Sequence, residues 1–243
     1  MADKIRTPLC VEAIEKMKSK DYFRVVVFGA SNTERYMPGG HWSDVLEVGI
    51  LAVYGRKFHL INAGYSGNNT REGLARFDRD VASFNPDIVV ITFAGNDCNP
   101  APAKFVPEEE FAANLDQIVA GVRVLGAVPI LQTYYQMDLA AMEPERAAMA
   151  PRYMELIREA ASRNQVFLVD QNKYFNAIPA NTLRYELLHD PMHVNEYGNM
   201  FIGIILLHHL GIDPRCIFRN NPLLPAMTLY DSIAGSPDDT PEM

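Results

Sequence analysis

Five short apolar runs, rich in β-branched residues, constrain most strongly what this chain can fold into. They lie at residues 23–28, 58–61, 88–93, 128–132 and 166–169. Because each run is apolar along nearly its whole length, we expect strands buried on both faces, as in a parallel sheet. The amphipathic segments between them predict helices around residues 9–19, 43–55, 70–83, 107–125, 144–163 and 194–210. This alternation predicts an α/β sandwich with right-handed crossovers.

The domain organisation follows from the even spacing of these segments. Residues 1–213 contain no internal repeat and no linker, which predicts a single catalytic or binding domain. Residues 214–243 differ, because they form a Pro-rich and acidic C-terminal extension. We expect this extension to be a solvated tail, and the alternative is an arm that lies on a second subunit of a homo-oligomer.

The charge balance excludes several classes of partner. The 243 residues include 22 Lys and Arg against 30 Asp and Glu, a formal net charge of −8. A chain of this charge lacks the basic surface of a general nucleic-acid binder and is a poor match for an anionic membrane. The most apolar stretch, residues 201–207, is too short to span a bilayer. The N-terminus has no apolar core of signal-peptide length, so we expect a cytoplasmic protein.

The thiols and histidines suggest neither a disulfide framework nor a metal centre. Cys10, Cys98 and Cys216 are odd in number and show no CxxC spacing, which predicts reduced thiols. His208 and His209 are adjacent within a predicted helix, so their side chains diverge on its surface. We expect one of these histidines to be packed and the other solvated, with no metal and no other cofactor.

Polar segments follow the predicted strands at the points where each strand ends. They are residues 29–33, 62–68 and 94–97, and a fourth polar segment, residues 190–193, precedes the last helix. Taken singly, each segment is explained as an ordinary turn or helix cap. In an open parallel sheet, however, ligands bind at the carboxyl ends of the strands, where these segments converge.

Together the four segments supply every group that acyl transfer by a serine requires. Ser31 can act as the nucleophile and His193 as the base, while Asp190, three residues earlier, can orient the imidazole. The oxyanion hole would consist of the Ser31 and Gly67 backbone N–H groups and the Asn96 side-chain amide.

This ordered set resembles the SGNH hydrolase family, also called GDSL esterases and lipases. The Ser, Gly, Asn and His of the family name fall on Ser31, Gly67, Asn96 and His193, and the resemblance covers residues 22–211. It implies a three-layer α/β/α sandwich of flavodoxin-like type with a central parallel sheet. It also implies hydrolysis of ester or thioester bonds in small-molecule substrates without a cofactor or metal.

The first motif departs from the family pattern. The family usually has Gly-Asp-Ser there, whereas this chain has Gly29-Ala30-Ser31. Since Asp190 supplies the carboxylate of the triad, the departure leaves the nucleophile in place and raises the question of what braces its turn. An α/β-hydrolase fits less well because no G-x-S-x-G elbow is present. A flavodoxin-like cofactor protein is weaker still, since no phosphate-cradling loop is found.

The substrate is expected to be a short-acyl ester, such as an acetyl ester of a sugar or small alcohol, because no long apolar lid is evident. Asn32, Trp42 and Tyr134 are predicted to line the substrate pocket, although Trp42 could equally pack the start of a helix. Asp97 is expected to brace its own loop. Two alternatives stay open: an acyltransferase using the same triad, and a catalytically inactive binding domain on the same fold.

Overall fold

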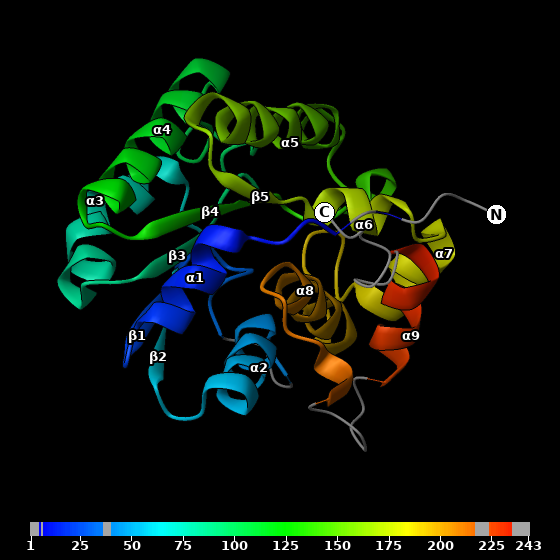
Figure 1. Cartoon of the computed structure of the whole chain (residues 1–243). Coiled ribbons are helices and arrows are strands. Elements are labelled where there is room, and N and C mark those ends of the chain that lie inside the picture. The colour runs from blue at the N-terminus through cyan, green and yellow to red at the C-terminus, as the bar shows by residue number, and fades with distance from the viewer. Residues whose placement is uncertain (1–4, 6, 36–39, 217–223, 235–243) are drawn as a thin grey trace.

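The structure, a computed structural model, describes residues 5, 7–35, 40–216 and 224–234. Its centre is a parallel sheet of five strands in the order β2-β1-β3-β4-β5 (Figure 1). The strands are β1 Phe23–Gly29, β2 Phe58–Gly64, β3 Ile88–Thr92, β4 Val128–Gln132 and β5 Phe167–Val169. Each coincides with one of the five apolar runs to within a few residues. The predicted parallel sheet is therefore confirmed.

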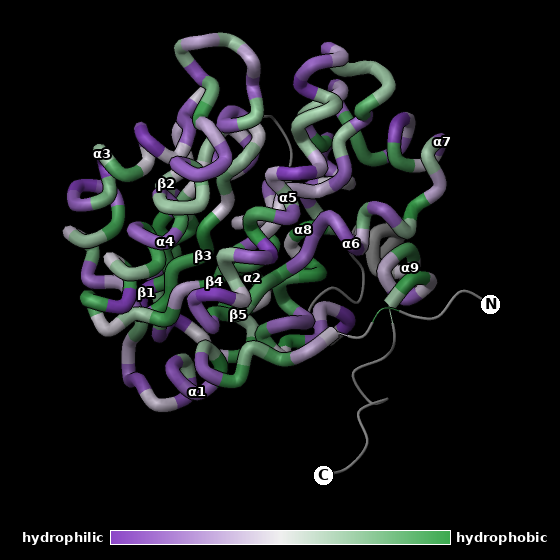
Figure 2. The backbone as a smooth tube through the Cα atoms, turned by 90° about the horizontal axis from the view of Figure 1, so that it is seen from above, coloured by the Kyte–Doolittle hydropathy of each residue, from purple (hydrophilic) through white to green (hydrophobic). Residues whose placement is uncertain are grey.

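Helices cover both faces of the sheet, so the molecule has three layers. Helices α1, α2 and α8 lie on one side, and α3, α4 and α5 lie on the other (Figure 1). The bounds are α1 Val11–Ser19, α2 Trp42–Tyr54, α3 Thr70–Asp80, α4 Glu108–Val124, α5 Pro144–Asn164, α6 Gln171–Asn176, α7 Ala180–Thr182, α8 Glu196–His209 and α9 Leu224–Ile233. Figure 2 shows hydrophobic residues running along the central strands and hydrophilic residues on the outer helices. This arrangement confirms the three-layer sandwich.

The central strands are buried because the helical layers enclose them. Every residue of β3 and β4 is buried, and β1 is buried except for the half-buried Arg24. β1 pairs with β2 on one side and β3 on the other, with Gly29 opposite both Gly64 and Thr92. The carboxyl ends of these three strands therefore lie level with one another, at the edge where parallel sheets bind ligands.

Side-chain caps fix where the helices nearest this edge begin. The Asn69 side chain accepts from the Glu72 N–H at 3.1 Å, and the Glu72 carboxylate accepts from the Asn69 N–H at 2.9 Å. The Asn195 side chain accepts from the Tyr197 and Gly198 N–H groups, both at 3.0 Å. These contacts satisfy helix N–H groups that have no intrahelical partner.

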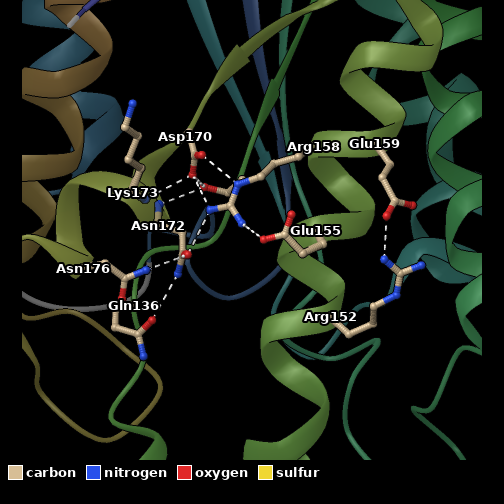
Figure 3. Close-up of polar contacts among 10 residues, drawn as sticks. Gln136, Arg152, Glu155, Arg158, Glu159, Asp170, Asn172, Lys173 and Asn176 are labelled. Atoms are coloured by element: carbon tan, nitrogen blue, oxygen red, sulfur yellow. Dashed lines mark hydrogen bonds and ion pairs between the residues drawn. The ribbon is translucent and has the colours of Figure 1, made fainter. Parts of the chain in front are cut away.

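A polar network ties the outer helical layer to the end of β5 (Figure 3). The Arg158 guanidinium on α5 donates to both carboxylate oxygens of Asp170, at 2.8 and 2.9 Å, and to Asn172 at 3.0 Å. Asp170 also accepts from the Lys173 N–H at 3.1 Å and so caps α6. A two-point Arg–carboxylate pair is geometrically specific, so it holds α5 and α6 in a fixed relation.

Part of the predicted C-terminal extension packs against the domain. The Tyr230 side chain of α9 is buried, stacks on the His208 ring at 4.2 Å between centroids, and bonds Thr7 at 2.6 Å. This segment is therefore not the solvated tail expected, while residues 217–223 and 235–243 lie outside the described residues. His208 and His209 are 4% and 2% exposed, so the expectation that one is solvated was wrong.

Two findings concern membrane and metal binding. No helix among the described residues is both long and apolar enough to cross a membrane. Within the same part of the chain, no three His, Cys, Asp or Glu side chains gather in a way that could hold a metal ion.

Candidate active site

The predicted nucleophile lies on a tight turn directly after β1. The Ala30 carbonyl accepts from the Thr33 and Glu34 N–H groups, both at 2.9 Å, and this turns the chain back at Ser31. The Ser31 Oγ lies 3.1 Å from the Nε2 atom of His193. Ser31 is 8% exposed, so the nucleophile is largely buried at this edge of the sheet.

The imidazole of His193 is oriented by Asp190 within one local turn. One Asp190 carboxylate oxygen lies 2.8 Å from His193 Nδ1, and the other accepts from the Met192 and His193 N–H groups at 2.7 and 2.8 Å. Burial by itself raises the pKa of Asp190, but these N–H groups and the imidazole lower it below its usual value overall. Asp190 therefore stays ionised and favours the tautomer with the proton on Nδ1, in which Nε2 is the acceptor for the Ser31 hydroxyl.

The three predicted oxyanion donors follow three adjacent strands. Ser31, Gly67 and Asn96 come after β1, β2 and β3, which are neighbours in the sheet. Gly67 has φ +78°, a left-handed conformation that glycine adopts without strain. The Asn96 side chain donates to the Asn68 carbonyl at 2.8 Å. Because a side-chain amide carries two N–H donors, this bond fixes the group and leaves one donor for a ligand.

A buried arginine braces the nucleophile turn, a role that the sequence did not reveal. The Arg76 guanidinium on α3 donates to the Gly29 carbonyl at 2.7 Å, the Ala63 carbonyl at 2.8 Å and the Asn68 side chain at 2.7 Å. It is 8% exposed and lies 4.6 Å from the centroid of the Phe28 ring. One side chain thus connects the ends of β1 and β2 to the oxyanion loop, and it supplies bracing that Ala30 cannot.

The three residues expected to line the substrate pocket are buried and hydrogen-bonded close to the nucleophile. Asn32 is 8% exposed, Trp42 1% and Tyr134 2%. The Trp42 indole N–H donates to the Asn32 carbonyl at 2.6 Å, and the Asn32 amide donates to the Tyr134 hydroxyl. Trp42 thus packs at the start of α2, the alternative that the sequence left open, and Asn32 and Tyr134 belong to a hydrogen-bond network next to Ser31.

Tyr135 connects the turn at Ser31 to the loop that carries His193, a role that the sequence did not predict. Its hydroxyl donates to the Asn32 side chain at 2.8 Å, contacts the Met192 carbonyl, and accepts from the Val194 N–H at 3.2 Å. Burial raises the pKa of this phenol, so it stays protonated and able to donate. The only available sequence signal was the pair of aromatic residues directly after the fourth apolar run.

The buried carboxylate of Asp97 connects the loop that carries Asn96 to α3. One oxygen of Asp97 accepts from the Thr70 N–H at 2.8 Å and from the Thr70 hydroxyl at 2.6 Å. Asp97 is fully buried, and burial raises its pKa to about 6. Ala94, just before this loop, has φ +137°, which is unfavourable for a residue with a side chain. The Asp97 carboxylate thus ties the loop that carries it to the start of α3, a contact that the sequence did not predict.

Comparison with known proteins is consistent with this geometry. Residues 27–200 match the model of the GDSL-like Lipase/Acylhydrolase family. Among curated proteins, the chain is 28% identical over 174 residues to an acetylxylan esterase from Geobacillus stearothermophilus, covering 68% of this chain and 79% of that protein. It is 36% identical over 107 residues to an isoamyl acetate-hydrolyzing esterase 1 homolog from Rattus norvegicus, covering 41% of each chain.

The fold matches solved structures of the same kind. A structure of the acetylxylan esterase Axe2 from Geobacillus stearothermophilus superposes with a TM-score of 0.68 at 24% identity, over 80% of this chain and 96% of that one. LAE5, an enzyme from the metagenome of Lake Arreo in Spain, superposes with a TM-score of 0.66 at 26% identity, over 79% and 96% of the two chains.

Proposed function

Because the chain belongs to the GDSL-like lipase/acylhydrolase family, and is therefore an ester hydrolase, we propose that Ser31, His193 and Asp190 form its catalytic triad. The observation that carries this proposal is a continuous chain of hydrogen bonds. His193 Nδ1 lies 2.8 Å from an Asp190 carboxylate oxygen, and His193 Nε2 lies 3.1 Å from Ser31 Oγ. In Axe2, variants that replace a serine, an aspartate or a histidine are described as catalytic mutants. The aspartate and histidine of that protein are three positions apart, the spacing of Asp190 and His193.

In the acylation half of the reaction, Ser31 Oγ attacks the acyl carbonyl carbon while His193 Nε2 takes the hydroxyl proton. The carbonyl oxygen gains negative charge and is stabilised by the Ser31 and Gly67 N–H groups and the Asn96 amide. The tetrahedral intermediate then collapses. His193 gives its proton to the leaving alcohol oxygen, and the acyl group remains on Ser31.

In the deacylation half, water replaces the alcohol. His193 takes a proton from the water as its oxygen attacks the acyl carbonyl, and the same three donors stabilise the second oxyanion. Collapse breaks the bond to Ser31 Oγ, which recovers its proton from His193, and the free acid leaves. Asp190 stays ionised throughout and stabilises the imidazolium that forms in each half.

We assign the substrate to short-acyl esters, and specifically to acetyl esters of a sugar or small alcohol. Two groups of relatives support this class, since an acetylxylan esterase and isoamyl acetate-hydrolyzing esterase homologs both carry acetyl esters in their names. Comparing kcat/KM over p-nitrophenyl esters of increasing acyl length tests the assignment. A maximum at acetyl is expected, and a maximum at long chains would refute it.

The triad is tested by hydrolysis of p-nitrophenyl acetate with wild type and Ser31→Ala. Ser31→Ala should lose at least about a thousandfold in kcat while keeping its circular dichroism spectrum. Ser83→Ala is the matched control, because Ser83 is exposed and its hydroxyl donates to the nearby Arg79 carbonyl, away from the proposed triad. A folded Ser31→Ala with wild-type activity would exclude Ser31 as the nucleophile. Product analysis with an added sugar acceptor distinguishes the two reactions. A hydrolase releases only free acid, whereas an acyltransferase transfers the acyl group to a hydroxyl of the sugar.

A further inference from the structure

A cavity of about 300 Å³ opens beside the carboxylate of the triad. Its lining includes Asp190, Pro191, His189 and Tyr185. The Asp190 side chain is 41% exposed, so this carboxylate faces the cavity as well as the imidazole. The mechanism above uses only the imidazole side of Asp190, and the cavity has no part in it.

A second cavity, of about 430 Å³, adjoins the first. Its lining includes Tyr185 again, together with Glu186, Asn195, Tyr197 and Leu229. Because Tyr185 lines both cavities, the two meet at this residue. Each has a size within or near the range of small-molecule sites.

Two tyrosines present large exposed aromatic faces at these cavities. Tyr185 is 75% exposed and Tyr197 is 44% exposed. Tyr185 lies in a π-helical turn, Leu183–Leu187, a rare backbone form that is frequent at functional sites. An aromatic side chain held open to solvent on such a turn gains little from burial, which points to a binding role.

The turn that carries Tyr185 is connected by hydrogen bonds to the loop that carries Asp190 and His193. Arg184, its neighbour, donates to both carboxylate oxygens of Asp138, at 2.5 and 2.8 Å. The Asp138 N–H in turn donates to the Pro191 carbonyl at 2.9 Å, one residue beyond the catalytic Asp190. The position of Tyr185 is thereby set relative to the triad.

From these features we propose that the two cavities are a subsite for a neutral oligosaccharide that carries the ester, an inference that rests on the proposed function. Exposed tyrosine faces suit packing against the C–H faces of pyranose rings, since each ring joins an apolar body to a polar hydroxyl. Asn195, Glu186 and His189 offer hydrogen-bond donors and acceptors for sugar hydroxyls.

The chemistry of the lining disfavours other ligands. The cation Arg184 is already paired with Asp138, while Glu186 and Asp190 add negative charge, so an anionic polymer would be repelled. The linings combine apolar side chains, such as Leu187, Leu188 and Leu229, with hydroxyl, amide and carboxyl groups, and this mixed character matches a sugar ring better than a plain acyl chain. A neutral polyhydroxylated chain satisfies both conditions.

The position of the subsite determines which substrates reach it. The imidazole of His193 faces Ser31 with Nε2 and Asp190 with Nδ1, so the cavity beside Asp190 lies beyond the imidazole from the bond that is cleaved. A small ester such as p-nitrophenyl acetate ends before the cavity. On this proposal, the alcohol portion has to be longer than a single small group to reach Tyr185.

The experiment compares kcat/KM on p-nitrophenyl acetate with kcat/KM on acetylated xylo-oligosaccharides of increasing length. Tyr185→Ala should lower kcat/KM on the longer oligosaccharides about tenfold, mainly through KM, and leave p-nitrophenyl acetate unchanged. Tyr185→Phe keeps the ring and should retain most of the activity. Tyr22→Ala is the control, because Tyr22 is 48% exposed but precedes β1, at the opposite edge of the sheet.

Three outcomes would overturn the subsite. In the first, Tyr185→Ala matches wild type at every oligosaccharide length. In the second, it loses activity equally on p-nitrophenyl acetate, which would make Tyr185 a support of the triad. In the third, wild type shows no rise in kcat/KM with length. If wild type fails on p-nitrophenyl acetate, the proposed function fails instead. Calorimetric titration of wild type and Tyr185→Ala with unacetylated xylo-oligosaccharides then still decides the subsite.

Discussion

Asn68 connects Arg76 to the oxyanion donors, and its removal should impair catalysis without unfolding the protein. Its side chain accepts from Arg76 Nε at 2.7 Å, and its carbonyl accepts from the Asn96 amide at 2.8 Å. It also directly follows Gly67 in the chain. In Asn68→Ala, the loop that carries Gly67 and also holds the Asn96 side chain loses its bond to the Arg76 brace.

The magnitude follows from these contacts. Asn68 is 8% exposed, so Asn68→Ala leaves a buried charged N–H of Arg76 unpaired, at a cost of about 1.5–3 kcal/mol of stability. For a chain of this size, that lowers Tm by roughly 3–12 °C. One oxyanion donor contributes about a hundredfold or more to kcat, so a partly misplaced loop should lower kcat by about 10- to 100-fold. KM should change less, because the oxyanion exists only in the transition state and the intermediates.

The assay is steady-state hydrolysis of p-nitrophenyl acetate combined with thermal unfolding. Asp80→Asn is the matched control, because Asp80 accepts from the same guanidinium at 3.0 Å but touches no part of the proposed site. It should lower Tm and leave kcat within about twofold, because Arg76 keeps its bonds to Gly29, Ala63 and Asn68. Unchanged kcat in Asn68→Ala would refute the reasoning. An equal loss of kcat in both variants would show that the lower activity follows from lower stability of the protein and not from a displaced oxyanion loop.

Two further predictions concern the oxyanion hole and pH. Asn96→Ala should lower kcat for p-nitrophenyl acetate by about 10²- to 10³-fold with little change in KM, and full activity in steady-state kinetics would contradict its role. Burial lowers the pKa of three histidines from 6.5 to about 4, so at pH 5 each of them binds a proton when the protein unfolds: His41, His208 and His209. Burial raises the pKa of Asp97 to about 6, so at the same pH this carboxyl group releases a proton on unfolding. Because unfolding takes up about two protons in net, the free energy of unfolding should fall by about 3 kcal/mol per pH unit as the pH drops through 5. Urea titrations that give the same free energy of unfolding from pH 6.5 to 4 would contradict this.

The sheet could be predicted from the sequence because its strands are buried on both faces. Such strands form apolar runs that stand out from amphipathic helices, and β1, β3 and β4 lie within one or two residues of the predicted bounds. The residues that follow the strands could also be located, because parallel strands end at one edge. Ser31 and His193 are 162 positions apart in the chain, and that topology brings them to 3.1 Å.

The supporting residues could not be predicted, because their roles depend on burial. Arg76 lies on an amphipathic helix where an arginine usually faces solvent, and nothing local shows that its partners are the carbonyls of two strands. For Trp42 the sequence left substrate contact and packing at the start of a helix equally open, and the structure shows the indole buried at the start of α2, where its N–H bonds the Asn32 carbonyl. Tyr230 lies in a Pro-rich segment that reads as a tail, although its ring is buried against α8.

The central claim is that Ser31 is a nucleophile activated by His193, and covalent labelling tests it most directly. The protein is incubated with a fluorophosphonate, and the modified peptide is identified by mass spectrometry. We predict a single adduct on Ser31, absent from Ser31→Ala and formed far more slowly in His193→Ala, because without the imidazole the hydroxyl is a weak nucleophile. An adduct on another serine, or equally fast labelling of His193→Ala, would contradict the account.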